Sequence, residues 1–238
     1  MKDLRVLYAL LRLQRAFTSG SMSGDSPFVL TDSDVMAGER MIAAKLQKAR
    51  LTRCDLSGIN LIMARLDGAT LTDCTIERAS AEGVKWYDAR LSGCSFRGSA
   101  VGGGAWRGAL VERCDLRDAH LAEGKWERGA LIACTLEEAT LFQTNLSRAR
   151  VVDCDLRNTS MMEAFLEETT FLRCDLRGAD LSKALLGQTV FDRCALHGVK
   201  GIPRVEAPYT LLAPDLSPEG DGSGVVSPAE ARRALGWP

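Results

Sequence analysis

Large apolar residues recur at every fifth position through most of this chain. Stepping in fives from Leu46 to Leu196 visits 31 positions, and all of them hold Leu, Ile, Val, Met, Phe or Trp except Ala81. Two residues before each, from Ala44 to Cys194, 29 of 31 residues are Ala, Cys, Gly, Ser or Thr. A period of five fits neither an α-helix, at about 3.6 residues per turn, nor a flat strand, at about 2. The backbone must therefore turn at regular intervals.

A second, longer period shows how these units combine. The eight cysteines stand at every twentieth position without exception, at Cys54, Cys74, Cys94, Cys114, Cys134, Cys154, Cys174 and Cys194. Four pentapeptides therefore form one coil, and each cysteine is expected to lie above the one before it. The repeat runs through residues 41–200 and thus fills eight such coils.

The units resemble the pentapeptide-repeat family, in which a small residue is followed by Asp or Asn, by Leu or Phe, and by two variable residues. Good copies begin at Cys54, Cys114, Cys174 and Ala179. The resemblance implies an all-β fold, a right-handed quadrilateral β-helix of about eight coils with short terminal helices or caps. In that fold the large and small residues point inward, and the other three face solvent.

Three regions follow from this pattern. Residues 1–40 are expected to form an N-terminal helix or capping extension, residues 41–200 the β-helix, and residues 201–238 a tail with a short helix. The tail helix is predicted by Ser227, Pro228 and Glu230, which form a capping box with proline at the first helical position. This tail is expected either to cap the last coil or to form a dimer contact, because the ends of a solenoid need covering.

Charge and hydropathy narrow the classes of function. The chain carries 30 Lys and Arg against 31 Asp and Glu, so no global field attracts nucleic acid, and direct binding of nucleic acid is not expected. No apolar run reaches the roughly 20 residues that span a membrane. The apolar stretch of residues 6–13 is interrupted by Arg12 and lacks a convincing cleavage site, which favours a cytoplasmic location.

Candidate chemistry is sparse, and we predict no enzyme activity, no catalytic residue, no cofactor and no metal site. A straight column of cysteines cannot surround zinc tetrahedrally, and parallel side chains are badly aimed for disulfides. Two histidines stand alone, and residues 215–223 alternate oxygen ligands like a calcium loop but lack its final glutamate. Trp86, Trp106 and Trp126 occupy inward positions, either as core or as an aromatic ligand slot. Core packing is favoured, with space supplied by Gly102, Gly103, Gly104 and Gly124.

Sorting the outward residues by coil position gives two candidate partner-binding surfaces. One carries acidic residues, among them Asp55, Asp115, Asp155 and Asp175, although arginines are interleaved with them. The other has few charges, and we name it the apolar face, made of Ile42, Ile62, Met63, Ala122, Phe142 and Met162. Exposed apolar ladders often mark interfaces, but cover by a terminal segment is the alternative.

The family resemblance implies a function in binding rather than catalysis. Its best-described activity is binding DNA gyrase and topoisomerase IV as a DNA mimic, which protects them from topoisomerase poisons. The interleaved arginines weaken that hypothesis here. The alternative is a scaffold or adaptor, for example in secretion or membrane-associated machinery, that docks a protein through the apolar face.

Overall fold

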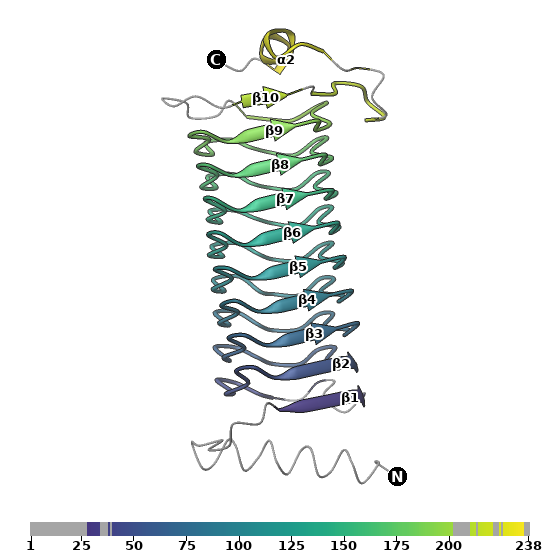
Figure 1. The fold of residues 1–238 in the computed structure, drawn as a ribbon, viewed down its shortest axis with the longest axis vertical. Helices are drawn as coiled ribbons and strands as arrows, with labels where there is room; N and C mark the ends of the chain where they lie inside the picture. Colours follow the sequence, from purple (N-terminus) through teal and green to yellow (C-terminus); the bar gives the residue numbers. More distant parts are fainter. Residues whose placement is uncertain are drawn as a thin grey trace.

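The chain forms a right-handed, four-sided solenoid of parallel β-strands, seen in a computed structural model (Figure 1). The structure describes residues 28–33, 38, 40–201, 210–212, 214–220, 224 and 226–235. One side of the solenoid is a continuous ten-stranded parallel sheet in the order β1 to β10. The strands are β1 (Val29–Ser33), β2 (Arg50–Cys54), β3 (Thr70–Thr72), β4 (Arg90–Ser92), β5 (Leu110–Glu112), β6 (Ala130–Ile132), β7 (Arg150–Val152), β8 (Thr170–Leu172), β9 (Val190–Asp192) and β10 (Thr210–Leu212).

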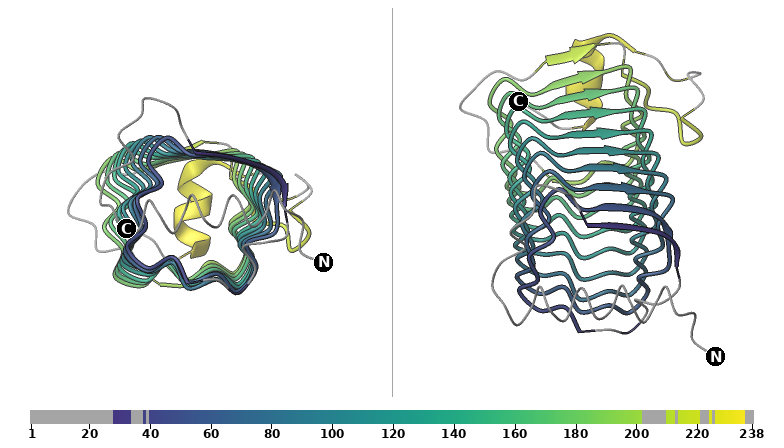
Figure 2. Two further views of the ribbon diagram at one scale, coloured as in Figure 1. Left: turned by 90° about the horizontal axis from the view of Figure 1, so that it is seen from below. Right: turned by 60° about the horizontal axis from the view of Figure 1, so that its bottom comes forward.

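The register confirms the coil of four pentapeptides. From β2 to β10 each strand residue pairs with its equivalent one coil later, as Leu51 does with Leu71. The other three sides are joined by single parallel bridges with the same offset, such as Asp55 with Thr75 and Asn60 with Ser80. The backbone groups of every side therefore bond to the coils above and below. Seen along the axis, the coils lie directly over one another (Figure 2).

Inward and outward positions follow the five-residue pattern. All 31 predicted large positions and all 31 small positions from residue 44 to residue 196 are buried. They form one core cluster that runs the length of the described solenoid. The prediction of which residues face inward is confirmed.

Each corner between sides uses a left-handed backbone conformation. Every fifth residue from Ala43 to Gly198 has a φ between +50° and +71°, and most of these residues are not glycine. For a residue other than glycine this conformation costs of the order of 1–2 kcal/mol. Hydrogen bonds across most turns, such as Ala44 N to Met41 O at 3.1 Å, and the stacking of coils hold the corners in place.

Both ends extend beyond the sequence repeat. Strand β1 adds a rung before residue 41, and its Ser33 pairs with Cys54 whereas Arg40 bridges Asn60, so one extra residue lies between Ser33 and Arg40. Strand β10 adds a rung after the last pentapeptide, and Asp215 bridges Ala195. At about 4.8 Å per rung, ten strands give a stack roughly 43 Å long.

The C-terminal helix predicted from the capping box is present as α2 (Pro228–Leu235). Ser227 N donates to Glu230 Oε2 at 2.9 Å, and Glu230 N donates to Ser227 Oγ at 3.4 Å. The helix contacts β10, and Ala231 is fully buried, so α2 lies across the C-terminal end of the core (Figure 2). The helix or capping extension was predicted for residues 1–40, and residues 1–27 of that range lie outside the described residues. Across the part of the chain that the structure describes, no helix is long and apolar enough to cross a bilayer.

Candidate partner-binding surface

The acidic candidates lie in one column, and arginines of the same chain neutralise the charges of Asp115, Asp155 and Asp175. Asp115 accepts hydrogen bonds from Arg117 Nε at 2.9 and 3.1 Å and from Arg117 Nη2. These bonds hold the pKa of Asp115 below its ordinary value. Asp175 binds Arg177 through the same atoms, with Nε to Oδ1 at 2.8 Å. A carboxylate chelated by a guanidinium two residues later presents little free negative charge to a partner.

Arg157 ties part of this column into a network. It binds Asp155 through Nη2 at 2.7 Å, and it also lies 3.2 Å from Glu137 and 3.8 Å from Asp175. Burial raises the pKa of Asp155, but the hydrogen bonds from Arg157 outweigh burial and hold that pKa below its ordinary value. Asp55 accepts the same backbone hydrogen bond as the other three, from Ser57 N at 2.9 Å, but Ser57 stands where the other three have an arginine.

The apolar face extends over seven coils, from Ile42 to Met162, and is interrupted by Glu82 and by the glycines at 102 and 103. Its backbone bonds run from coil to coil, with Met63 N to Glu82 O at 2.9 Å and Gln143 N to Met162 O at 3.0 Å. Ile42 and Met63 are exposed, at 37% and 58%, whereas Ile62, Ala122, Phe142 and Met162 are half-buried. The structure therefore brings the six predicted residues onto one side of the solenoid.

The middle of the apolar face carries almost no side chains. A Cβ added at Gly103 would meet nothing within 4 Å, and one added at Gly102 would approach Ala122 O at 3.1 Å. Met63 extends over the next coil, because its Sδ lies 2.7 Å from where a Cβ of Gly83 would stand. We name residues 102 and 103 the bare stretch. Apolar side chains flank it, Ile62 and Met63 before it and Phe142 and Met162 after it.

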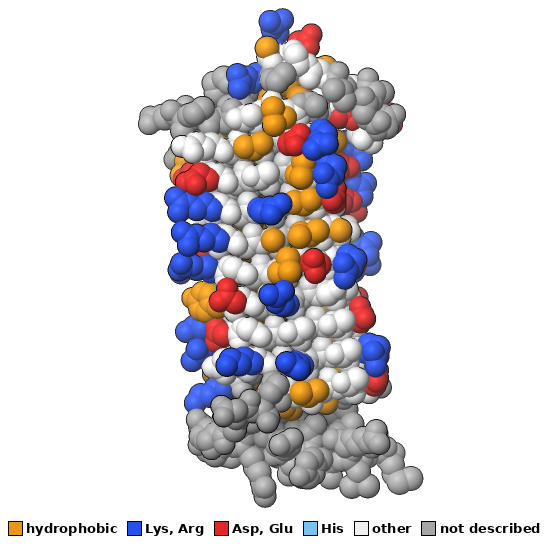
Figure 3. Space-filling model, viewed as in Figure 1, with side chains coloured by type: hydrophobic (Ala, Val, Ile, Leu, Met, Phe, Trp, Pro, Cys, Tyr) orange, Lys and Arg blue, Asp and Glu red, His pale blue; other side chains and the backbone are white. Residues whose placement is uncertain are grey.

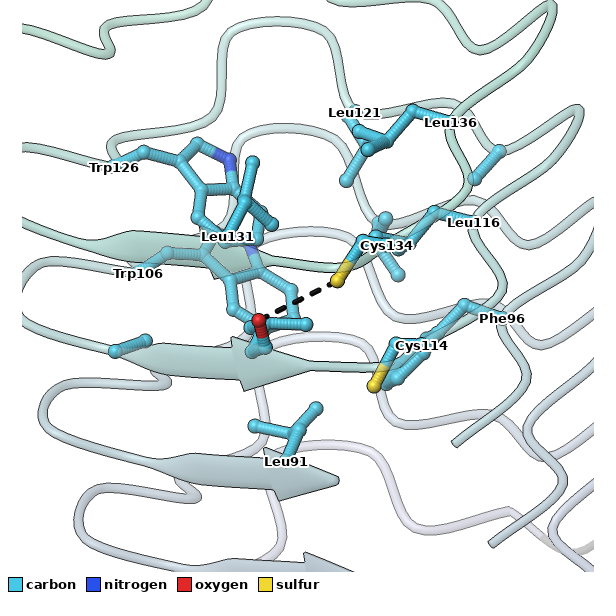
Figure 4. Close-up of a cluster of buried hydrophobic side chains, with 14 of the residues drawn as sticks. Leu91, Phe96, Trp106, Cys114, Leu116, Leu121, Trp126, Leu131, Cys134 and Leu136 are labelled. Atoms are coloured by element: carbon cyan, nitrogen blue, oxygen red, sulfur yellow. Dashed lines mark hydrogen bonds between the residues drawn. The ribbon is translucent and has the colours of Figure 1, made fainter. Parts of the chain in front are cut away.

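The tryptophans belong to the core, as favoured above. Trp86, Trp106 and Trp126 are at most 1% exposed. Trp106 stacks on Trp86 at 4.8 Å and on Trp126 at 4.3 Å between ring centroids (Figure 4). The enclosed void near Trp86 has a volume of only about 10 Å³, which is room for one water at most. A ligand slot does not fit this packing.

Two of the four glycines make room for the indoles, and two do not. A Cβ at Gly104 would stand 2.7 Å from Trp106 Nε1, and one at Gly124 would stand 2.9 Å from Trp126 Nε1. Gly102 and Gly103 face outward and have no such contact, so the prediction for them was wrong. All three indole Nε1 atoms are buried and have no hydrogen-bond partner among the described residues.

One apolar surface was missed by the sequence analysis, which assigned no candidate to the side formed by the strands. Ile132, Val152 and Leu172 stand outward in register on β6, β7 and β8. Val152 is only 9% exposed. Figure 3 shows hydrophobic side chains gathered over the side of the solenoid that the strands form. Sorting residues 132, 152 and 172 by their shared position in the coil would have revealed them. We name them the strand patch.

An open groove lies at a corner next to the strands. It has a volume of about 430 Å³ and is lined by three arginines, three glutamates, a serine and the exposed Phe165. Arg148 pairs with Glu168 at 2.9 Å, so positive and negative groups alternate along the groove. The groove therefore has no strong electrostatic field of one sign that would attract a charged ligand.

The described residues of the calcium-like segment, 215–220, form a structural turn. Asp215 is 6% exposed, and its carboxylate accepts hydrogen bonds from Ser217 N at 2.9 Å, Ser217 Oγ at 3.0 Å and Gly224 N at 3.1 Å. Within the described ranges no group of three or more His, Cys, Asp or Glu side chains is arranged to hold a metal.

Comparison with known proteins agrees with this geometry. Two family models match: "Pentapeptide repeat region" over residues 124–200 and "Pentapeptide repeats (8 copies)" over residues 40–73. The chain belongs to the pentapeptide-repeat proteins. The stretch between these matches, residues 74–123, contains Ala81, Val84, Trp86, Gly104 and Trp106, where this pentapeptide-repeat protein departs furthest from the family pattern.

Solved structures with the same fold are distant in sequence. HetL, a pentapeptide repeat protein involved in heterocyst differentiation regulation from the cyanobacterium Nostoc sp. strain PCC 7120, has 19% identity and a TM-score of 0.51. The match covers 88% of this chain and 96% of HetL. A trypsin-treated form of QnrB1, a plasmid-mediated fluoroquinolone resistance protein, has 20% identity and a TM-score of 0.35, covering 85% of this chain and 100% of that chain. No curated protein sequence matches this chain significantly.

Proposed function

We propose that this pentapeptide-repeat protein is a non-catalytic scaffold that docks a protein partner on its apolar face. The observation that carries the proposal is the ladder of outward apolar side chains around the bare stretch at Gly102 and Gly103. Contiguous exposed apolar surface on a rigid frame is typical of protein interfaces. Backbone exposed at glycine lets a partner approach closely.

The charges around the face suggest the chemistry of the partner. Glu82 and Glu123 are exposed and have no ion pair among the described residues, whereas Glu163 pairs with Lys183 at 3.2 Å. The partner segment is therefore an apolar one that carries Lys or Arg at its edges. We also propose a cytoplasmic location, because eight free thiols suit a reducing compartment.

Filling the bare stretch tests this function. Gly103→Gln is compatible with the fold, because Gln143 occupies the same coil position with a φ of 52°. The variant should abolish capture of cross-linked partners from an extract of the source cells, and Phe142→Asp should do the same. The matched control is Gly68→Gln, the same change at a left-handed corner on another side, where Gln188 has a φ of 59°. Partners retained by all three variants would refute docking at this face.

Topoisomerase binding as a DNA mimic is the second candidate, and it is supported by the rod shape and by the carboxylate column. The arginine pairs oppose it, because each one cancels negative field within a Debye length of about 8 Å. A gyrase supercoiling assay tests it, with and without a poison and across salt concentrations. Mimicry predicts inhibition or rescue that weakens with salt and is lost when Asp115, Asp155 and Asp175 become Asn. No effect at large molar excess removes this candidate for gyrase.

A further inference from the structure

The cysteines form an unbroken column of thiols along the inside of the solenoid. None of the eight is in a disulfide, all are at most 2% exposed, and one stands in every coil from Cys54 to Cys194. Figure 4 shows the sulfur atoms of Cys114 and Cys134 one above the other on consecutive coils. Ala fills the equivalent small position on other sides, as at Ala49 and Ala79. Packing alone therefore does not require sulfur here.

Each thiol lies against the backbone of its own coil. Its Sγ lies 3.3–3.5 Å from the carbonyl oxygen two residues earlier. The amide N–H groups of Cys94 and Cys134 point at the sulfur of the next coil, at 3.4 Å.

The geometry that excludes zinc suits a different class of metal ion. Zinc needs four ligands in a tetrahedron, but each gap in the column offers only two sulfurs on opposite sides. Soft monovalent d¹⁰ ions bind thiolates strongly and accept two collinear ligands. With a metal–sulfur bond of about 2.3 Å, a linear S–metal–S unit spans about 4.6 Å. The rungs are about 4.8 Å apart, and the carbonyl oxygens beside each sulfur favour positive charge.

We propose that the cysteine column binds soft monovalent cations, Cu(I) or Ag(I), one between each pair of consecutive thiols. One thiol loses its proton and forms the metal–sulfur bond, and the sulfur of the next coil is the second donor. One proton leaves to solvent for each cation bound, no atom changes oxidation state, and no net charge is buried. Eight thiols enclose seven gaps, so the full column takes seven cations and releases seven protons.

Entry requires local opening, because every sulfur is buried. Coils at the ends of a solenoid open most readily, so uptake by the native protein should be slow and faster during refolding. The probe is Ag(I), supplied as nitrate in chloride-free buffer, either to the native protein for hours or during refolding from denaturant. Bound silver is measured after dialysis, released protons by pH-stat, and the fold by circular dichroism.

Two double variants distinguish binding between consecutive thiols of the column from binding to individual thiols. Cys94→Ala with Cys154→Ala leaves six thiols as three isolated pairs, with three gaps. Cys54→Ala with Cys194→Ala also leaves six thiols, but they form one run with five gaps. We expect about seven bound ions for the wild type, five for the end variant and three for the interior variant, with β structure retained and thermal stability raised.

Equal uptake by the two double variants would overturn the proposal, since the number of bound silver ions would then follow the number of thiols rather than the number of gaps. Loss of β structure on binding, or fewer than one proton released per ion, would also overturn it. So would the absence of uptake by both native and refolded protein. Binding of Cu(I), supplied with a competing chelator, should show the same order of stoichiometries.

Discussion

Replacing Trp106 by Ala tests whether the indole column is part of the stabilising core. The indole is 1% exposed, stacks on two neighbours, and meets Phe96 edge-on at 6.3 Å between ring centroids. Removing a buried Trp costs about 3–5 kcal/mol through lost burial and the cavity left behind. Two stacked pairs add about 1–3 kcal/mol. Removing a buried Nε1–H that has no partner returns about 1–3 kcal/mol. Because the last two contributions offset each other, the net loss of unfolding free energy should be about 3–5 kcal/mol.

The assay is equilibrium unfolding in urea, followed by circular dichroism at several protein concentrations. Trp106→Phe is the control, because it keeps a stacked ring and removes the Nε1–H that lacks a partner. It should cost clearly less than Trp106→Ala. A loss below about 1 kcal/mol for Trp106→Ala would mean that the indole is not core. Equal losses for both variants would refute the account of stacking.

Four other outcomes are expected. Thiol titration should find eight free thiols after denaturation and almost none that react quickly in the native protein, whereas thiols lost in pairs and recovered by reductant would reveal disulfides. Stability should fall as the pH drops through the acidic range, because Asp115 and Asp155 have folded-state pKa values below their unfolded values and the unfolded chain takes up more protons. Asp115→Asn should flatten this pH dependence in thermal melts. An unchanged pH dependence would contradict a stabilising role for the pair of Asp115 and Arg117. Ala133→Gly should stabilise the protein by about 1 kcal/mol, because Ala133 has a φ of 52°. Ala139→Gly, at an inward position, should destabilise it. The reverse order in urea unfolding would refute the conclusion that the left-handed corners cost free energy. Phe142→Asp should leave the circular dichroism spectrum dominated by β structure, and unfolding would mean that this side chain is part of the core.

The sequence predicts the inward residues because only they are constrained to two size classes at fixed spacing. It does not predict the left-handed corners, since residues such as Lys48, Met63 and Glu168 share no chemical type that signals a positive φ. Strands β1 and β10 were also missed. Their pairing uses backbone groups alone, so a rung can be added by a segment without the pentapeptide pattern.

The candidate surface was predicted less completely than the fold. Coil position places Asp115 and Arg117 on either side of an inward leucine, but the chelation between them depends on side-chain rotamers that a sequence does not show. The strand patch escaped notice because Ile132, Val152 and Leu172 occupy a column that is polar in other coils, as at Thr52 and Ser92. The bare stretch was missed although the five-residue pattern already places Gly102 and Gly103 outward, because these glycines were assigned to making room for the indoles.

The constant offset between coils makes the length of this protein a quantity that evolution can change in whole steps. Deleting residues 121–140 in frame would join Ala119 and His120 directly to Leu141, whose inward position is that of the lost Leu121. Every column would keep its register, and the stack would become shorter by one rung of about 4.8 Å. Recombination between neighbouring coils can therefore lengthen or shorten the molecule by whole coils, while the two ends with their own non-repeating rungs stay unchanged.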